Sequence, residues 1–275
     1  MREENLRKAL LWAGGSTLVV FALGPFLWMI VVSLVSNPGF LVAGGGRLTL
    51  VHYGEVLSSR SLHFLHYFRN SLVVAVLASL AVTAVASPAG YAVSRMRFPG
   101  RTVVPLLVLA VSMFPQISIV GYLYRIFSRV GMLNTHAALI LPYIAYTVPI
   151  ALWINLSYFS QIPMDLDRAA LVDGAGRLKT LRRIILPLAL PGIFSSLLLV
   201  FIACFNEFLF AIMLTVDYHA RTLPVGIALF EGLHGEIPWG KLMAASSLAS
   251  VPLVVVTLVF QRYIIQGLTG GAVKG

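Results

Sequence analysis

The stretch ALLWAGGSTLVVFALGPFLWMIVVSLV, residues 9–35, contains no charged side chain. A helix crosses the hydrocarbon layer of a bilayer with about 20 predominantly apolar residues. The short polar segment before it holds Arg2, Arg7 and Lys8, like the basic region of a signal peptide. The apolar run is too long for a cleaved signal, so we expect an uncleaved first membrane span.

Further apolar segments follow along the chain, at about 71–94, 103–124, 137–159, 191–214 and 242–261. Overall, 59% of the residues are hydrophobic and 11% are charged, whereas about a quarter of a soluble domain is charged. The sequence therefore predicts an all-α, polytopic membrane protein with six transmembrane helices. We expect a cytoplasmic N-terminus at 1–8, a six-span transmembrane domain at 9–262 and a cytoplasmic tail at 263–275.

The basic residues indicate how the chain is oriented. With the N-terminus inside, the inner connections hold 13 Lys and Arg residues and the outer ones hold 7. Positively charged connections favour the cytoplasmic side, so both termini are expected there. A net charge of +10 could also suggest nucleic acid as a partner, but these residues lie in short connections between spans. We expect contact with the lipid bilayer and no nucleic-acid binding.

The connection QIPMDLDRAALVDGAGRLKTLRRIILPLALPG, residues 161–192, contains more charged residues than any other connection between spans. Asp165 is expected to cap a short helix, with Asp167 near its positive N-terminal end. Asp173-Gly174 should end that helix, because glycine tolerates the left-handed conformation. A second, basic amphipathic helix should follow, with Pro187 marking the return to the membrane. Such a surface suits either anionic lipid headgroups or insertion of the small residues into a protein cleft.

The segment RAALVDGA (168–175), followed by ILP (185–187), resembles the EAA loop of ABC-importer permeases. The resemblance implies that the loop, at 161–190, forms a coupling helix that docks on a cytoplasmic ABC ATPase dimer. Arg168 stands where the family has glutamate, so that glutamate's contacts are not carried over. The coupling residues implied are Asp167, Arg168, Ala169, Ala170, Asp173, Gly174 and Ala175.

The resemblance extends over most of the chain, to sugar-importer permeases of the maltose and trehalose type. It implies a non-catalytic permease subunit that moves a sugar such as trehalose or maltose across the cytoplasmic (inner) membrane by alternating access. ATP and magnesium would be bound by the ATPase. A second, different permease and an extracytoplasmic solute-binding protein are the other partners implied. The matching segments are FRNSL (68–72), AGYAVSR (89–95), FPG (98–100), LNT (133–135), LILPY (139–143), NEFL (206–209), TLPVG (222–226) and GLTGGAVKG (267–275).

Polar and aromatic residues in the expected spans are candidates for the translocation path. Glu207, beside Asn206, lies in an apolar segment, where a carboxylate should face the bundle interior, a partner or water. An inter-helix hydrogen bond is the alternative role. Sugars bind hydroxyl partners and aromatic faces, although membrane aromatics often only pack. The candidates for sugar contact are Tyr143, Tyr146, Asn155, Met113, Phe114 and Gln116.

Other activities have weaker support in the sequence. An importer of another solute, such as glycerol phosphate, remains an alternative. A membrane-embedded transferase would have to use the acids at 165, 167 and 173, and an ion-coupled carrier should show internal repeats, which we do not find. His63 and His66 lack a third metal ligand nearby. Gly235-x-x-x-x-Gly240-Lys241 imitates a nucleotide-binding loop, but Leu242 replaces its Ser or Thr.

Overall fold

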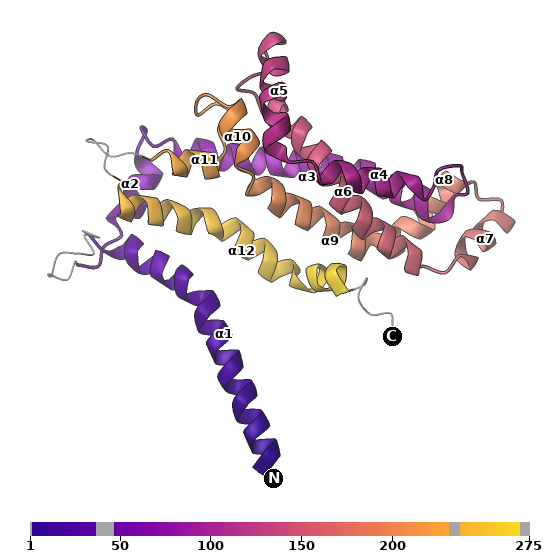
Figure 1. Ribbon diagram of the computed structural model, residues 1–275, viewed down its shortest axis with the longest axis horizontal. Coiled ribbons are helices and arrows are strands. Elements are labelled where there is room, and N and C mark those ends of the chain that lie inside the picture. Colours follow the sequence, from indigo (N-terminus) through magenta and orange to yellow (C-terminus); the bar gives the residue numbers. More distant parts are fainter. Residues whose placement is uncertain (1, 37–46, 231–236, 270–275) are drawn as a thin grey trace. The chain divides into compact units, whose positions relative to one another are not determined.

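The computed structural model describes residues 2–36, 47–230 and 237–269, and these residues are almost entirely helical (Figure 1). Gly235 of the nucleotide-loop imitation and residues 270–275 of the expected cytoplasmic tail fall outside the described residues. The helices are α1 (Arg2–Leu34), α2 (Val51–Ser58), α3 (Phe64–Arg95), α4 (Val103–Ser112), α5 (Gln116–Arg129), α6 (His136–Gln161), α7 (Asp165–Val172), α8 (Arg177–Thr180), the π-helical turn η1 (Leu181–Ile185), α9 (Leu186–Phe205), α10 (Leu209–Leu214), α11 (Leu223–Ala228) and α12 (Trp239–Thr269).

The contacts divide the chain into two compact units. Unit 1 comprises Met1–Leu65 and Ile227–Val251, and unit 2 comprises His66–Gly226 and Pro252–Gly275. In the described part of the chain, five helical stretches are long and apolar enough to cross a membrane. They are Leu10–Leu34, Phe64–Arg95, His136–Gln161, Arg177–Phe205 and Trp239–Tyr263. The α4–α5 pair makes a sixth if the two helices count as one span.

The third expected span, 103–124, is broken rather than continuous. Helix α4 ends at Ser112, α5 begins at Gln116, and the two helices are bent by 84°. Pro115 has extended backbone, with φ −62° and ψ 126°, immediately before α5. Proline lacks an N–H and crowds the preceding turn, so a helix ends at or kinks near it. The other span prolines remain inside helices at Pro25, Pro88, Pro142, Pro149, Pro191 and Pro252.

The connection between the fourth and fifth expected spans also has boundaries that differ from the prediction. The basic helix is not separate from the fifth span, because α8, η1 and α9 form one continuous stretch from Arg177 to Phe205. Pro187 is the second residue of α9 and lies inside this continuous stretch, so the helix has to accommodate its missing N–H. Just before it, the N–H of Leu186 bonds to the carbonyl of Leu181, the wider spacing of a π turn. Local widening thus accommodates the proline.

Both ends of the chain are more helical than expected. Helix α1 begins at Arg2, within the segment expected to precede the membrane, and Lys8 pairs with Glu4 at 2.9 Å. Helix α12 continues to Thr269, beyond the expected boundary at residue 262. Helix α3 begins at Phe64, seven residues before the expected span begins. These helices thus continue beyond the apolar runs from which the spans were predicted.

Unit 1 is held together by contacts of α2. His52 Nε2 lies 3.0 Å from the carbonyl oxygen of Val35, and the hydroxyls of Tyr53 and Ser33 lie 2.7 Å apart. Lys241 Nζ lies 3.0 Å from a carboxylate oxygen of Glu55, which links α12 to α2. Lys241, the lysine of the nucleotide-loop imitation, therefore has a structural partner.

Unit 2 is built around α3, α6 and α9. Tyr91 of α3 and Phe159 of α6 form a buried cluster with Leu181, Ile185 and Ala189 from the η1–α9 stretch. Small residues allow the helices to approach closely, as is common in membrane bundles. A Cβ on Gly192 of α9 would lie 2.1 Å from the ring of Tyr158 in α6.

Gly192→Ala should therefore destabilise the chain by about 1–3 kcal/mol, the usual effect of overpacking. Gly121→Ala is the matched control, because nothing lies within 4 Å of a Cβ there. It should leave stability unchanged or raise it, since alanine favours helix by about 1 kcal/mol over glycine. Thermal unfolding of the purified variants in detergent measures the difference, and equal midpoints would contradict the close approach.

Candidate functional site

Helix α7 is the core of the expected coupling loop and lies at one end of unit 2, beside α8 (Figure 1). Its exposed side chains are mostly apolar. Val172 is 86% exposed, Leu171 54% and Met164, just before the helix, 46%. Ala169 is also exposed, whereas the side chain of Ala170 in the same helix is buried. Helix α7 thus exposes apolar side chains at both ends, namely Met164 before it and Leu171 and Val172 at its last turn, together with the small Ala169 and the charged pair Asp165 and Arg168. We call Met164, Leu171 and Val172 the α7 tip.

A buried ion pair fixes α7 to the end of α3. Arg95 Nη1 lies 3.2 Å from Asp167 Oδ2, and the Arg95 side chain is only 4% exposed. The hydroxyl of Tyr91 donates to Asp167 Oδ1 at 3.1 Å. Arg95 also donates to the carbonyl oxygens of Phe159, at 2.6 Å, and of Ile162. We call Arg95, Asp167 and Tyr91 the Arg95 latch.

The other loop residues shape the turn. Asp165 is not the helix cap that was expected; it is the first residue of α7 and pairs with exposed Arg168 at 3.0 Å. Gly174 has φ +74°, so it takes the left-handed conformation that ends the helix, as predicted. The N–H of Ala175 bonds to the carbonyl of Ala170 at 2.9 Å and closes the turn. Asp173 is the exposed residue that follows α7.

Glu207 lies in a break between α9 and α10 and not inside a continuous span. It accepts hydrogen bonds from the N–H groups of Phe210, at 2.8 Å, and Ala211, at 3.1 Å. The hydroxyl of Tyr143 donates to it at 2.6 Å. Glu207 therefore satisfies the first free N–H groups of α10 and links that helix to α6. Asn206 is exposed and donates to the carbonyl of Ile202 at 2.9 Å.

The remaining candidates for sugar contact fall into two groups. Tyr143 and Asn155 are buried within helix packing. Asn155 donates to Ser87 at 3.3 Å and accepts from Ser196 at 3.0 Å, so it joins α3, α6 and α9. Phe114, Gln116 and Tyr146, in contrast, line a mainly apolar cavity of about 340 Å³ between α5 and α6. Met113, at the α4–α5 bend, is 78% exposed.

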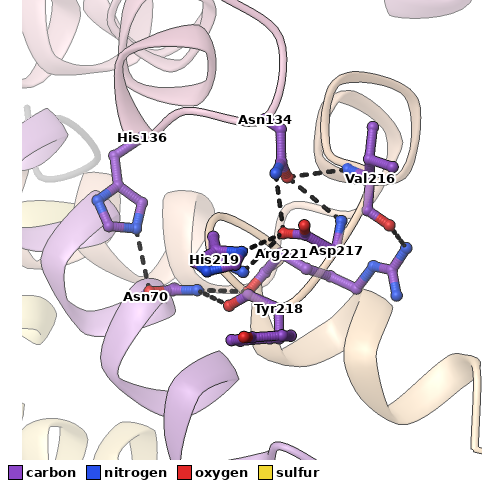
Figure 2. Close-up of polar contacts among 8 residues, drawn as sticks. All are labelled: Asn70, Asn134, His136, Val216, Asp217, Tyr218, His219 and Arg221. Atoms are coloured by element: carbon purple, nitrogen blue, oxygen red, sulfur yellow. Dashed lines mark hydrogen bonds and ion pairs between the residues drawn. The ribbon is translucent and has the colours of Figure 1, made fainter.

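A second polar cluster, the loop clamp, lies near the beginning of α3 and α6 (Figure 2). Asn134, at φ +59°, accepts from the N–H groups of Val216 and Asp217 and donates to the Asp217 carboxylate at 2.8 Å. Asn70 donates to the carbonyls of Tyr218 and Arg221, and its oxygen lies 3.0 Å from His136 Nε2. The clamp fastens the loop after α10 to α3 and α6. Its members are Asn70, Asn134, His136, Val216, Asp217, Tyr218, His219 and Arg221.

One member of the loop clamp, the carboxylate of Asp217, is charged at ordinary pH. Hydrogen bonds from Asn134 and from the His219 N–H lower the pKa of Asp217 to about 2. A lowered carboxyl pKa stabilises the fold above the unfolded value of 3.8, and that stabilisation is lost as pH falls toward 2. The carboxylate therefore remains ionised wherever a cell would operate.

The two histidines weighed as metal ligands have other contacts. His63 Nδ1 lies 3.0 Å from the carbonyl oxygen of Ser61, and the ring of His66 meets Tyr218 edge-on with centroids 5.3 Å apart. Among the residues that the structure describes, no three His, Cys, Asp or Glu side chains come together as a metal site. Cys204 is a buried free thiol.

The bundle of apolar helices, with α7 in the connection between α6 and α9, corresponds to a known class of transport protein. Residues 84–270 match the family model of the binding-protein-dependent transport system inner membrane component. The match covers most of the chain, so the protein belongs to this family. It is a membrane permease subunit of an ABC importer and not an enzyme, and the all-α membrane fold predicted from the sequence is confirmed.

Two relatives and one solved structure are similar to this chain over nearly its whole length. The chain is 54% identical to the trehalose/maltose transport system permease protein MalG of Thermococcus litoralis, over 100% of both chains. It is 38% identical to the trehalose transport system permease protein SugB of Mycobacterium tuberculosis, over 98% of this chain and 99% of that one. A chain of a bacterial ABC transporter that imports alginate shares the fold, with a TM-score of 0.75 at 20% identity over 96% of this chain and 98% of that one.

The Tyr143–Glu207 bond can be tested by a double-mutant cycle. Tyr143→Phe and Glu207→Gln should each destabilise the chain by roughly 1–3 kcal/mol, because each leaves buried polar groups without their partner. The double variant should lose less than the two effects added, since both changes remove the same bond. Thermal unfolding in detergent measures all four proteins. Strictly additive effects would show that the two residues do not act together.

Proposed function

We propose that this chain imports trehalose, maltose or a closely similar disaccharide. The observation that carries the substrate class is the 54% identity, over both full lengths, to a permease named for trehalose and maltose transport. A second relative, at 38% identity, is named for trehalose transport alone. Both names include trehalose, which favours a sugar over the alternative of glycerol phosphate.

We infer that α7 is the element that docks on a cytoplasmic ATPase. Its tip exposes Val172, Leu171 and Met164 to the surroundings, and an exposed apolar group of this kind marks an interaction surface. Its base is held by the buried Arg95 latch, so a force applied to the tip reaches the helix bundle. A lipid-facing helix would need no such anchor. In this arrangement the exposed Arg168–Asp165 pair lies at the rim of the contact.

The remaining partners follow from the same arrangement. Docking of α7 on an ATPase places both termini in the cytoplasm, in agreement with the distribution of Lys and Arg. The loop clamp then lies on the outer side, where a solute-binding protein would deliver the sugar. A second, different permease would complete the pathway, because six spans enclose one poorly. ATP and magnesium would be bound by the ATPase and not by this chain.

Within the chain, we propose that the sugar passes the cavity lined by Phe114, Gln116 and Tyr146. Aromatic faces and an amide suit a sugar, which stacks its apolar faces and bonds its hydroxyls. Met113 and Asn206 are exposed and can border this path. Tyr143, Asn155 and Glu207 have partners within the helix packing, so their role is to hold α6, α9 and α10 together.

Val172→Asp should abolish association with the ATPase while the chain still inserts in the membrane. It places a charge at the most exposed apolar position of the α7 tip, where docking would bury it unpaired. Val130→Asp is the matched control, because Val130 is 60% exposed but lies between α5 and α6. Co-purification with the ATPase measures the difference. Normal ATPase recovery with Val172→Asp would contradict docking through α7.

The substrate class is tested with the assembled transporter in proteoliposomes. Trehalose or maltose, added with the solute-binding protein, should raise the rate of ATP hydrolysis and be taken up. Glycerol phosphate should do neither, because it offers one charged group and no pair of sugar rings. Stimulation by glycerol phosphate alone would favour the alternative substrate, and stimulation by neither would reject both.

A further inference from the structure

Arg95 connects elements that are distant in the sequence. Helix α7 follows α6 through residues 162–164 and precedes α8 through residues 173–176, so its links to α6 and α9 are covalent. Helix α3 has no such link to α7. Among the hydrogen bonds and ion pairs found in the described ranges, Arg95 and Tyr91 are the α3 side chains that hold α7, both through Asp167.

The same guanidinium also holds the end of α6. It donates to the carbonyl oxygens of Phe159 and Ile162, which are among the last carbonyls at the C-terminal end of α6. The Phe159 carbonyl also accepts the N–H of Ile162, the C-cap residue, at 3.4 Å. A cation is favourable here, at the negative end of the helix dipole. Arg95 therefore ties α3 to the C-terminus of α6 and to Asp167 of α7 with one planar, permanently charged group.

The surroundings of the pair leave room for it to move. A cavity of about 100 Å³ adjoins it, lined by Tyr91, Arg95, Met96, Asp167, Leu171, Arg177 and Thr180. Within the described part of the chain, Arg95 Nη1 and Asp167 Oδ2 have no hydrogen-bond partner, although these two atoms lie 3.2 Å apart. The attraction is thus mainly electrostatic and tolerates some change of angle. A pair of this kind can stay joined while α7 tilts.

We propose that Arg95 is a positioning residue for energy coupling, because it makes α3 move together with α7. Without the Arg95 latch, a displacement of α7 acts on α6 and α9 through the chain and reaches α3 only by side-chain packing. With the latch, α3 is pulled directly at its last turn. This proposal rests on α7 being the ATPase-docking element. It assigns to Arg95 and Asp167 a role in transmitting motion that does not require either residue to touch the ATPase.

The test compares transport per ATP in the assembled transporter, using Asp167→Asn, Arg95→Gln and the double variant. Asp167→Asn is nearly isosteric and leaves the bonds from Arg95 to α6 in place, so the chain should fold. Each single change should keep the ATPase bound but reduce sugar uptake per ATP hydrolysed by at least about fivefold, the lower end of typical coupling between sites. The double variant should be no worse than the singles, because all three lack the same pair.

Two controls separate this role from a structural one. Arg97→Gln removes an equal charge two residues away, at an exposed position, and should leave uptake per ATP unchanged. Arg95→Lys retains the charge and should recover part of the coupling lost in Arg95→Gln. A merely structural role would lower the amount of folded transporter without changing uptake per ATP in the part that remains.

The outcomes also separate this proposal from the docking of α7. Asp167→Asn with wild-type uptake per ATP overturns the role of the latch, whatever the other variants show. If Val172→Asp releases the ATPase and Asp167→Asn retains normal coupling, docking stands and the latch fails. If Asp167→Asn itself releases the ATPase, Asp167 is a contact residue and the positioning role is overturned. If Val172→Asp retains the ATPase, the docking element lies elsewhere and both proposals fail.

Discussion

In the hydrocarbon of a bilayer, no water is available to backbone N–H and C=O groups, so each span must satisfy them within a helix. The structure of this chain follows from that constraint, including the places where helices break. Between α9 and α10, the carboxylate of Glu207 receives the N–H groups of Phe210 and Ala211. Between α8 and α9, a π turn accommodates Pro187. A helix can be interrupted at these points because a side chain or a widened turn provides the missing partners.

Lipid also removes the usual hydrophobic force between helices, so close packing and polar contacts hold the bundle. Gly192 of α9 admits the ring of Tyr158, and Asn155 bonds to serines of both neighbouring helices. The loop clamp and the Arg95 latch add polar contacts near opposite ends of α3. Asn70 and Arg95 are separated by roughly 38 Å along that helix, at 1.5 Å per residue. Both ends of α3 are thereby tied to neighbouring elements, as a transmitting element requires.

The sequence predicted some parts of the candidate site better than others. The turn at Gly174 was predictable, because a left-handed position strongly favours glycine. The roles of Tyr143, Asn155 and Glu207 were not, since a polar residue in an apolar segment suits a pathway and an inter-helix bond equally well. Arg95 was counted as one positive charge of an inner connection and as the last residue of the matching segment 89–95, and neither observation gave it a role. Its proximity to Asp167 depends on the packing of α3 against α6, and no local pattern encodes that distance.

The sequence by itself determined the membrane class and the approximate spans; the orientation from Lys and Arg and the coupling role of residues 161–190 stay predictions. These properties depend on runs of apolar residues, the side preference of charge and a short motif, all of which are local. Tertiary structure alone decided the 84° bend at Pro115, the partners of Glu207 and the burial of Arg95 against α7. Each of these depends on contacts between residues far apart in the chain, or on whether a helix kinks or breaks at a proline. Neighbouring helices decide between a kink and a break, because a broken helix needs hydrogen-bond partners for its free backbone groups.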